Sequence, residues 1–80
     1  MTDRAGLRLA LRAAGFADVH YWIEGVHEPA PTPVEFLFLR RHPAGGWETG
    51  LHERGRWEAL ARHTTESAAC AHLRQLLSEP

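Results

Sequence analysis

Apolar residues recur at helical intervals near both ends of the chain. Near the N-terminus the spacing is i, i+3, i+4 and i+7, at Leu7, Ala10, Leu11 and Ala14. This pattern predicts an amphipathic helix over residues 3–15, and Gly15 suits its C-terminal cap. A second apolar stripe predicts a final helix, which Thr64 or Thr65 can cap; its members are Ala69, Cys70, Leu73, Leu76 and Leu77.

Between the two helical patterns lie runs that are typical of strands. Residues 19–23 are rich in β-branched and aromatic side chains, which predicts a strand. Trp22 has the opposite parity to Tyr21 and Ile23, so it is left outside or at an edge if those two face the core. Residues 24–33 contain three prolines and predict a loop. Residues 34–40 are apolar on both parities, which predicts a central strand covered in part on both faces.

The stretch WETGLHERGRWEA, residues 47–59, predicts a hairpin. A three-residue loop at residues 53–55, with Gly55 in the left-handed conformation, places Trp47 and Trp57 on one face. That register buries Trp57, so that Trp57→Ala should cost about 3–5 kcal/mol of folding stability. A two-residue turn at Arg54 and Gly55 would shift the register and separate the two tryptophans. We prefer the first register because it gives the cleaner apolar and polar faces.

These elements predict one α+β domain over residues 1–80, in the order α-β-β-β-β-α. We expect an antiparallel sheet with the N- and C-terminal helices packed on one face. The single cysteine excludes an internal disulfide, and no run approaches the roughly 20 apolar residues of a membrane span. We therefore expect a cytoplasmic protein that does not enter a membrane.

The charge pattern argues against nucleic acid as a partner. Nine basic and ten acidic residues give a formal net charge of −1, which provides no electrostatic attraction to a phosphate backbone. Double-stranded-RNA-binding domains have a similar order of elements, but they need a basic patch at the start of the last helix. Residues 64–67 are TTES, with one acid and no base.

The residues that could carry chemistry do not form a reactive pattern. The six histidines have no familiar ligand spacing, so we expect no metal and no cofactor. Cys70 lies on the apolar stripe of the last helix and is best interpreted as a small buried hydrophobe. We therefore expect no catalytic residues and no enzyme activity.

The polar face of the hairpin is the remaining candidate for function. In the preferred register it carries Glu48, His52, Glu58 and Arg62, with Glu24 and Glu28 in the adjoining loop. Such a face is solvated or contacts a basic partner, with Trp22 as an aromatic anchor. The candidate partner-binding residues are Trp22, Glu24, Glu28, Glu48, His52 and Glu58.

Three short segments together resemble a known group of proteins. They are YWIEG at residues 21–25, which matches tyrosine-any-aliphatic-acid-glycine, Trp47 through ERG at residues 53–55, and TESAAC at residues 65–70. Over residues 20–77 the combination resembles short α/β immunity proteins encoded beside bacterial polymorphic toxins. The chain departs from their pattern at Thr49 and Gly50, where larger β-formers are usual, and at His63, where an aromatic residue is usual.

The resemblance implies a non-enzymatic antitoxin that binds one cognate toxin and covers its active site. Toxins of this kind often have basic active-site clefts, which would suit an acidic sheet face. The alternative is a small homodimeric or accessory interaction domain, whose sheet face or edge pairs with itself or with a larger complex.

Overall fold

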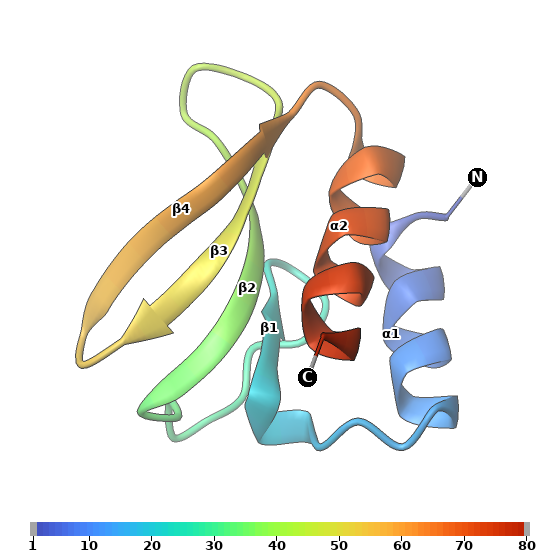
Figure 1. Cartoon of the computed structure of the whole chain (residues 1–80), viewed down its shortest axis with the longest axis vertical. Helices are drawn as coiled ribbons and strands as arrows, with labels where there is room; N and C mark the ends of the chain where they lie inside the picture. Colours follow the sequence, from blue (N-terminus) through green and yellow to red (C-terminus); the bar gives the residue numbers. More distant parts are fainter. Residues whose placement is uncertain (1, 80) are drawn as a thin grey trace.

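The computed structural model describes residues 2–79 as a four-stranded sheet with two α-helices (Figure 1). The elements in chain order are α1 (Arg4–Ala13), a 3-10 turn (Asp18–His20), β1 (Tyr21–Ile23), β2 (Glu35–Arg41), β3 (Trp47–Glu53), β4 (Arg56–His63) and α2 (Glu66–Ser78). The α+β class and the predicted order of helices and strands are confirmed. The first strand is shorter than predicted, because residues 18–20 turn before it begins.

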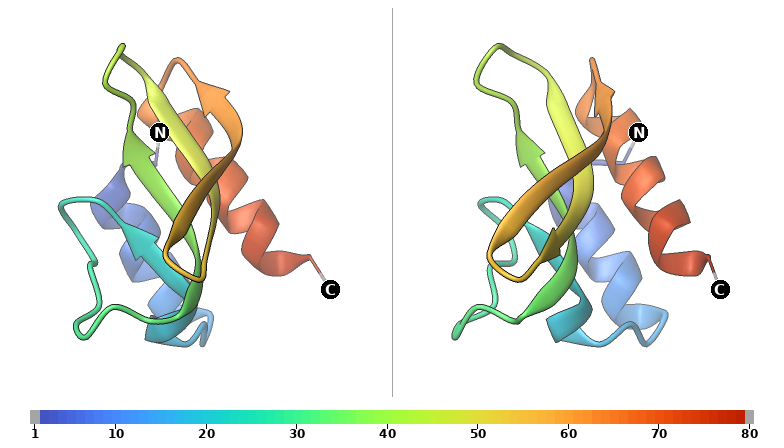
Figure 2. Two further views of the ribbon diagram at one scale, coloured as in Figure 1. Left: turned by 90° about the vertical axis from the view of Figure 1, so that its left-hand side faces the viewer. Right: turned by 60° about the vertical axis from the view of Figure 1, so that its left-hand side comes forward.

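The sheet order is β1-β2-β3-β4, and the sheet is mixed. β2, β3 and β4 are antiparallel neighbours, whereas β1 runs parallel to β2, with Tyr21 opposite Leu37. The expectation of a fully antiparallel sheet was therefore wrong at this one pair. The cause is the loop over residues 24–34, which returns along the length of the short β1 before β2 starts, as a parallel pair requires (Figure 2).

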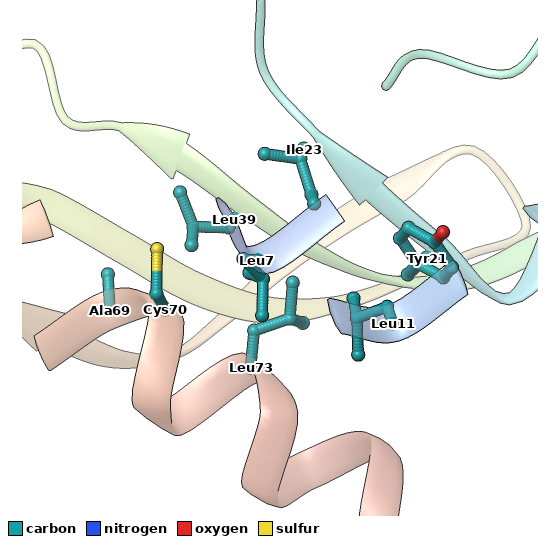
Figure 3. Close-up of a cluster of buried hydrophobic side chains, with 8 residues drawn as sticks. All are labelled: Leu7, Leu11, Tyr21, Ile23, Leu39, Ala69, Cys70 and Leu73. Carbon is teal, nitrogen blue, oxygen red and sulfur yellow. The ribbon is translucent and has the colours of Figure 1, made fainter. Parts of the chain in front are cut away.

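Both helices cover the same face of the sheet, as predicted (Figure 1). The core lies between them and the sheet; its buried members are Leu7, Leu11, Tyr21, Ile23, Leu39, Ala69, Cys70 and Leu73 (Figure 3). We call this side of the sheet the helix face. Neither helix among residues 2–79 has the length and apolar character needed to cross a membrane.

The helix ends follow from the sequence. The Asp3 carboxylate accepts a hydrogen bond from the Gly6 amide at 2.7 Å and caps α1. Gly15 follows α1 with φ +85°, and the amide of Phe16 donates to the carbonyl of Leu11 at 3.1 Å, which closes a Schellman motif. At α2 the Thr65 hydroxyl accepts from the Ala68 amide at 3.1 Å. The two predicted caps are confirmed: Gly15 ends α1, and Thr65, not Thr64, caps α2.

The register of the β3–β4 hairpin differs from the preferred prediction. Arg54 and Gly55 form a two-residue turn with φ values of 53° and 78°, the backbone of a type I′ turn. Trp57 consequently lies opposite His52, and Trp47 lies opposite His63. The two tryptophans are on opposite faces of the sheet, and Trp57 is 38% exposed instead of buried against the helices. The alternative register is the one that forms.

Candidate protein-binding surface

The face of the sheet opposite to the helices carries a layer of aromatic side chains. No element among residues 2–79 covers it (Figure 2, left). We call it the aromatic face and define it by Trp22 of β1, Phe36 and Phe38 of β2, His52 of β3 and Trp57 of β4. Because residues on one face of a strand alternate, β2 buries phenylalanines here and leucines on the helix face. This confirms that β2 is an interior strand covered in part on both faces.

Trp57 is the centre of the aromatic face. Its ring lies edge-on to those of Trp22, Phe38 and His52, with ring centroids 5.1, 5.0 and 4.8 Å apart. Phe36 and Phe38 beneath it are 2% and 0% exposed. Edge-to-face contacts at these distances contribute beyond simple burial. Trp57 therefore covers a small second core and still presents more than a third of its own surface to solvent.

Gly50 makes room for the Phe38 ring of the aromatic layer and for the backbone of β4. Phe38 and Gly50 are directly opposite in the β2–β3 pair, and a β-bulge interrupts the β3–β4 register between Thr49 and Gly50. A Cβ atom on residue 50 would lie 2.0 Å from the Glu58 carbonyl oxygen and 2.8 Å from Cζ of Phe38. Glycine is required here for close approach of the neighbouring strand and ring.

An ion pair between Arg40 and the buried carboxylate of Glu48 borders the aromatic face. The Arg40 guanidinium donates from Nε to Oε1 of Glu48 at 2.5 Å and lies 4.5 Å from the ring centroid of Trp57. Glu48 is 5% exposed, so its charge is already satisfied inside the protein. Arg62 lies opposite Glu48 on β4. The aromatic face is thus framed by two arginines and one buried carboxylate.

His52 is buried within the aromatic layer. Its ring stacks on Phe36 with centroids 4.4 Å apart and an interplanar angle of 7°. Within residues 2–79 its Nδ1 atom has no hydrogen-bond partner, and the residue is 7% exposed. His52 therefore acts here as a flat packing group, and its contact with Glu53 as an acid–base pair is excluded because neighbouring strand residues point to opposite faces.

The predicted partner-binding residues do not form one acidic surface. Trp22 lies on the aromatic face, as its parity predicted, whereas Glu48 and His52 lie there but are buried. Glu58 pairs with Leu51 and so lies on the helix face, contrary to the predicted common face. The register shift of the hairpin is the reason.

The other two predicted residues lie in the loop after β1. The Glu28 carboxylate accepts from the amide of Gly25 at 2.8 Å, and the backbone carbonyl of Glu24 accepts from Nη1 of Arg4 at 2.7 Å. Sequence reasoning missed Phe36, Phe38 and Trp57 as members of this surface. The apolar residues on both parities of β2 were the available signal.

The three segments that resemble the immunity proteins, residues 21–25, 47–55 and 65–70, each contact Arg4. Its guanidinium forms an ion pair with Glu66 at 3.1 Å, and it lies 4.9 Å from the ring centroid of Trp47. A Cβ atom on residue 25 would come within 3.1 Å of its Nη1 atom, so Gly25 makes room for it. Each of the three segments thus contributes a residue to the junction between the two helices and the sheet. Their role in this fold is structural.

A polar cluster of Thr49, His63 and His72 lies on the helix face. Oγ1 of Thr49 lies 3.0 Å from Nε2 of His63 and 2.6 Å from Nδ1 of His72, and Thr49 is fully buried. Burial and the neighbouring His72 lower the pKa of His63 below its ordinary value. Because the hydroxyl is inaccessible, this cluster is a polar element of the core and not a nucleophile with its base.

Cys70 is packed in the core, 1% exposed, as predicted. Burial raises the pKa of its thiol to about 11, so it carries no thiolate near neutral pH. In the part of the chain that the structure describes, no three histidine, cysteine or acidic side chains are grouped to hold a metal ion. Comparison of the chain with protein-family models, curated proteins and solved structures finds no match.

Proposed function

We propose that the chain is a non-enzymatic protein-binding module that docks on one partner protein through the aromatic face. The observation that carries this proposal is the position of Trp57, 38% exposed at the centre of a sheet face that neither α1 nor α2 covers. Tryptophan and arginine dominate the energetics of protein interfaces when they are clustered at the centre. Trp22, Trp57 and Arg40 form such a cluster, with centroid distances of 5.1 and 4.5 Å.

The size of the domain fits a protein whose task is binding. Its accessible surface is 5015 Å², so an interface of about 800 Å² on this side would occupy about one sixth of it. We propose that the partner is a cognate bacterial toxin and that the chain is its cytoplasmic antitoxin. The support for this identity is the resemblance over residues 20–77, and the aromatic face supplies a docking surface for it.

The test uses the product of the reading frame beside this gene. We expect it to arrest growth when expressed alone, to be tolerated when expressed with this chain, and to form an equimolar complex in size-exclusion chromatography with light scattering. Trp22→Ala should weaken the complex at least about tenfold, as expected for a central interface tryptophan. Leu9→Ala is the matched control, because Leu9 is 69% exposed on α1, outside the aromatic face. A non-toxic neighbour that forms no complex refutes the antitoxin role.

A second candidate, self-association, is favoured by the outer edge of β4. Within residues 2–79 β4 is an edge strand, with β3 as its single neighbour. Its charged residues, Arg56, Glu58 and Arg62, and the adjacent bulge oppose edge-to-edge pairing, which is why we rank this candidate second. A dimer in the light-scattering measurement that Glu58→Arg disrupts would favour it over the antitoxin.

A further inference from the structure

A groove with leucines and charged residues in its lining lies on the helix face, beyond the part that the helices cover. The β3–β4 hairpin diverges from α2 towards its turn (Figure 1). A hollow of about 310 Å³ lies between the sheet and the end of α2, where Leu37 and Leu51 meet Leu76 and Leu77. A second hollow of about 440 Å³ continues from Leu51 to the turn of the hairpin. All four leucines remain half-buried, so apolar surface is left accessible.

Exposed carboxylates surround this groove. They are Glu35 and Glu79 at the first hollow, and Glu53 and Glu58 at the second. The ion pairs among residues 2–79 involve none of them. Arg54 and Arg56 line the second hollow and match its two carboxylates in number, whereas the first hollow has Glu35 and Glu79 with His20 and no arginine. The excess of acids and the apolar floor of leucines are thus at the first hollow, and we call the two hollows together the acidic groove.

One pair of these carboxylates lies where mutual repulsion destabilises the fold. Glu35 and Glu53 are directly opposite each other in the antiparallel β2–β3 pair. Like charges at such positions destabilise a sheet. A ligand that carries positive charge would relieve this repulsion.

We propose that the acidic groove binds a basic amphipathic helix of a partner protein. β2 and β3 at the first hollow are interior strands with a neighbour on each side, so they offer no backbone edge for an added strand. At the second hollow β4 is the edge strand, and its charged residues Arg56 and Glu58 oppose the addition of a strand. Recognition must therefore use side chains, and an amphipathic helix presents an apolar stripe to such a groove. Its leucine-like side chains contact Leu51 and Leu76, while its lysines or arginines approach Glu35 and Glu53. Phe36 and Trp57 of the aromatic face also border the two hollows, whereas Trp22 lines neither. The contacts proposed here use Leu51, Leu76, Glu35 and Glu53 and do not depend on docking at the aromatic face.

The probe for the test is a fluorescent synthetic helix of about 18 residues, five turns, with Leu along one face and Lys elsewhere. Its binding to the full chain is followed by fluorescence anisotropy. We expect a saturable, equimolar interaction that weakens as salt rises from about 0.01 M to about 0.15 M, because the Debye length shortens from about 30 Å to about 8 Å. A matched peptide with Glu in place of Lys should not bind. Equal binding of both peptides, or of neither, overturns the proposal.

Variants separate the groove from general attraction to an acidic protein. Glu35→Gln with Glu53→Gln should weaken binding about three- to tenfold, the effect of two exposed ion pairs. The control removes the same charge elsewhere, through Glu24→Gln with Glu28→Gln, and should change binding less than about twofold. Equal losses in the two double variants overturn the groove as the site.

The apolar floor is tested on α2. Leu76→Gln keeps a good helix former at a partly exposed position and should weaken the Leu/Lys peptide at least about tenfold. Circular dichroism and the melting temperature show whether this variant stays folded. Trp22→Ala should bind the peptide like the parent chain, so failure of the aromatic face and failure of the groove are distinguishable. Unchanged binding by folded Leu76→Gln overturns the proposal.

Discussion

Gly50 should be the glycine least tolerant of a methyl group, although its backbone needs no left-handed conformation. In Gly50→Ala the new Cβ would lie 2.0 Å from the carbonyl oxygen of Glu58 and 2.9 Å from the Cα of Ala59. Both are backbone atoms of β4, so no side-chain rotation relieves the contact. β4 must move by about 1 Å or more, since ordinary contacts between such atoms are about 3.3–3.6 Å.

The expected cost has two parts. Overpacking of a well-packed site costs about 1–3 kcal/mol, and displacement of β4 weakens about two ladder hydrogen bonds at about 1 kcal/mol each. Contact with the Phe38 ring, 2.8 Å from the new atom, disturbs the aromatic layer as well. We expect a loss of about 3–5 kcal/mol, a large share of the total free energy of unfolding of a domain this small.

The assay is urea unfolding followed by tryptophan fluorescence, with thermal melting as a second measurement. A loss of about 3 kcal/mol should lower the melting temperature by about 12–24 °C. Gly15→Ala is the control, because it meets no atom within 4 Å and only its φ of +85° is unfavourable. It should cost about 1–2 kcal/mol. A cost below about 1 kcal/mol for Gly50→Ala would refute the observed β3–β4 register, since only that register presses β4 against residue 50.

Three other perturbations test separate parts of the structure. The lowered pKa of His63 means that the folded chain binds fewer protons than the unfolded chain, so stability should fall as pH drops below about 6.5, the ordinary histidine value. His63→Gln should flatten this pH dependence in urea titrations between pH 7 and pH 5. An unchanged dependence of stability on pH would contradict the burial of His63 beside His72. Glu35→Gln should raise the free energy of unfolding by about 0.2–1 kcal/mol by removing the repulsion with Glu53, and a decrease would show that the two carboxylates do not repel. Arg4→Ala should lower the free energy of unfolding by about 1–3 kcal/mol, because it removes the contacts of α1 with Glu66 of α2, the Glu24 carbonyl and the Trp47 ring. Thermal melting that shows no loss would mean that this junction is dispensable.

Most of the fold could be predicted because local patterns and tertiary packing agree. The helical stripes, the caps at Gly15 and Thr65, and the two-sided burial of β2 are consequences of spacing within single segments. The parallel pairing of β1 could not be predicted in the same way. It depends on the path of the loop over residues 24–34, and a proline-rich loop is equally compatible with either direction.

The preferred prediction of the hairpin register was wrong for a specific physical reason. Type I′ turns need positive φ at both central residues, and Asn-Gly or Asp-Gly is their usual sequence signal. Arg54 has no such preference, yet it adopts φ 53° in the structure. The pairing it permits places Trp57 over Phe36 and Phe38, so tertiary burial outweighs the local cost of the turn. Gly50, which is unusual inside a strand, was the signal for this arrangement.

The first segment of the resemblance, residues 21–25, contains both residues that specify the fold and one that can specify a partner. In the first segment of the resemblance, Tyr21 and Ile23 are fully buried, and Gly25 makes room for Arg4. The position between the two buried residues, which the pattern leaves open to any residue, holds Trp22 on the aromatic face. A change at that position leaves the junction of helices and sheet intact and alters the surface offered to a partner. We therefore expect Trp22→Ala to keep the fold while weakening the complex, whereas Gly25→Ala, at φ +77°, should strain the fold and affect the complex only through stability.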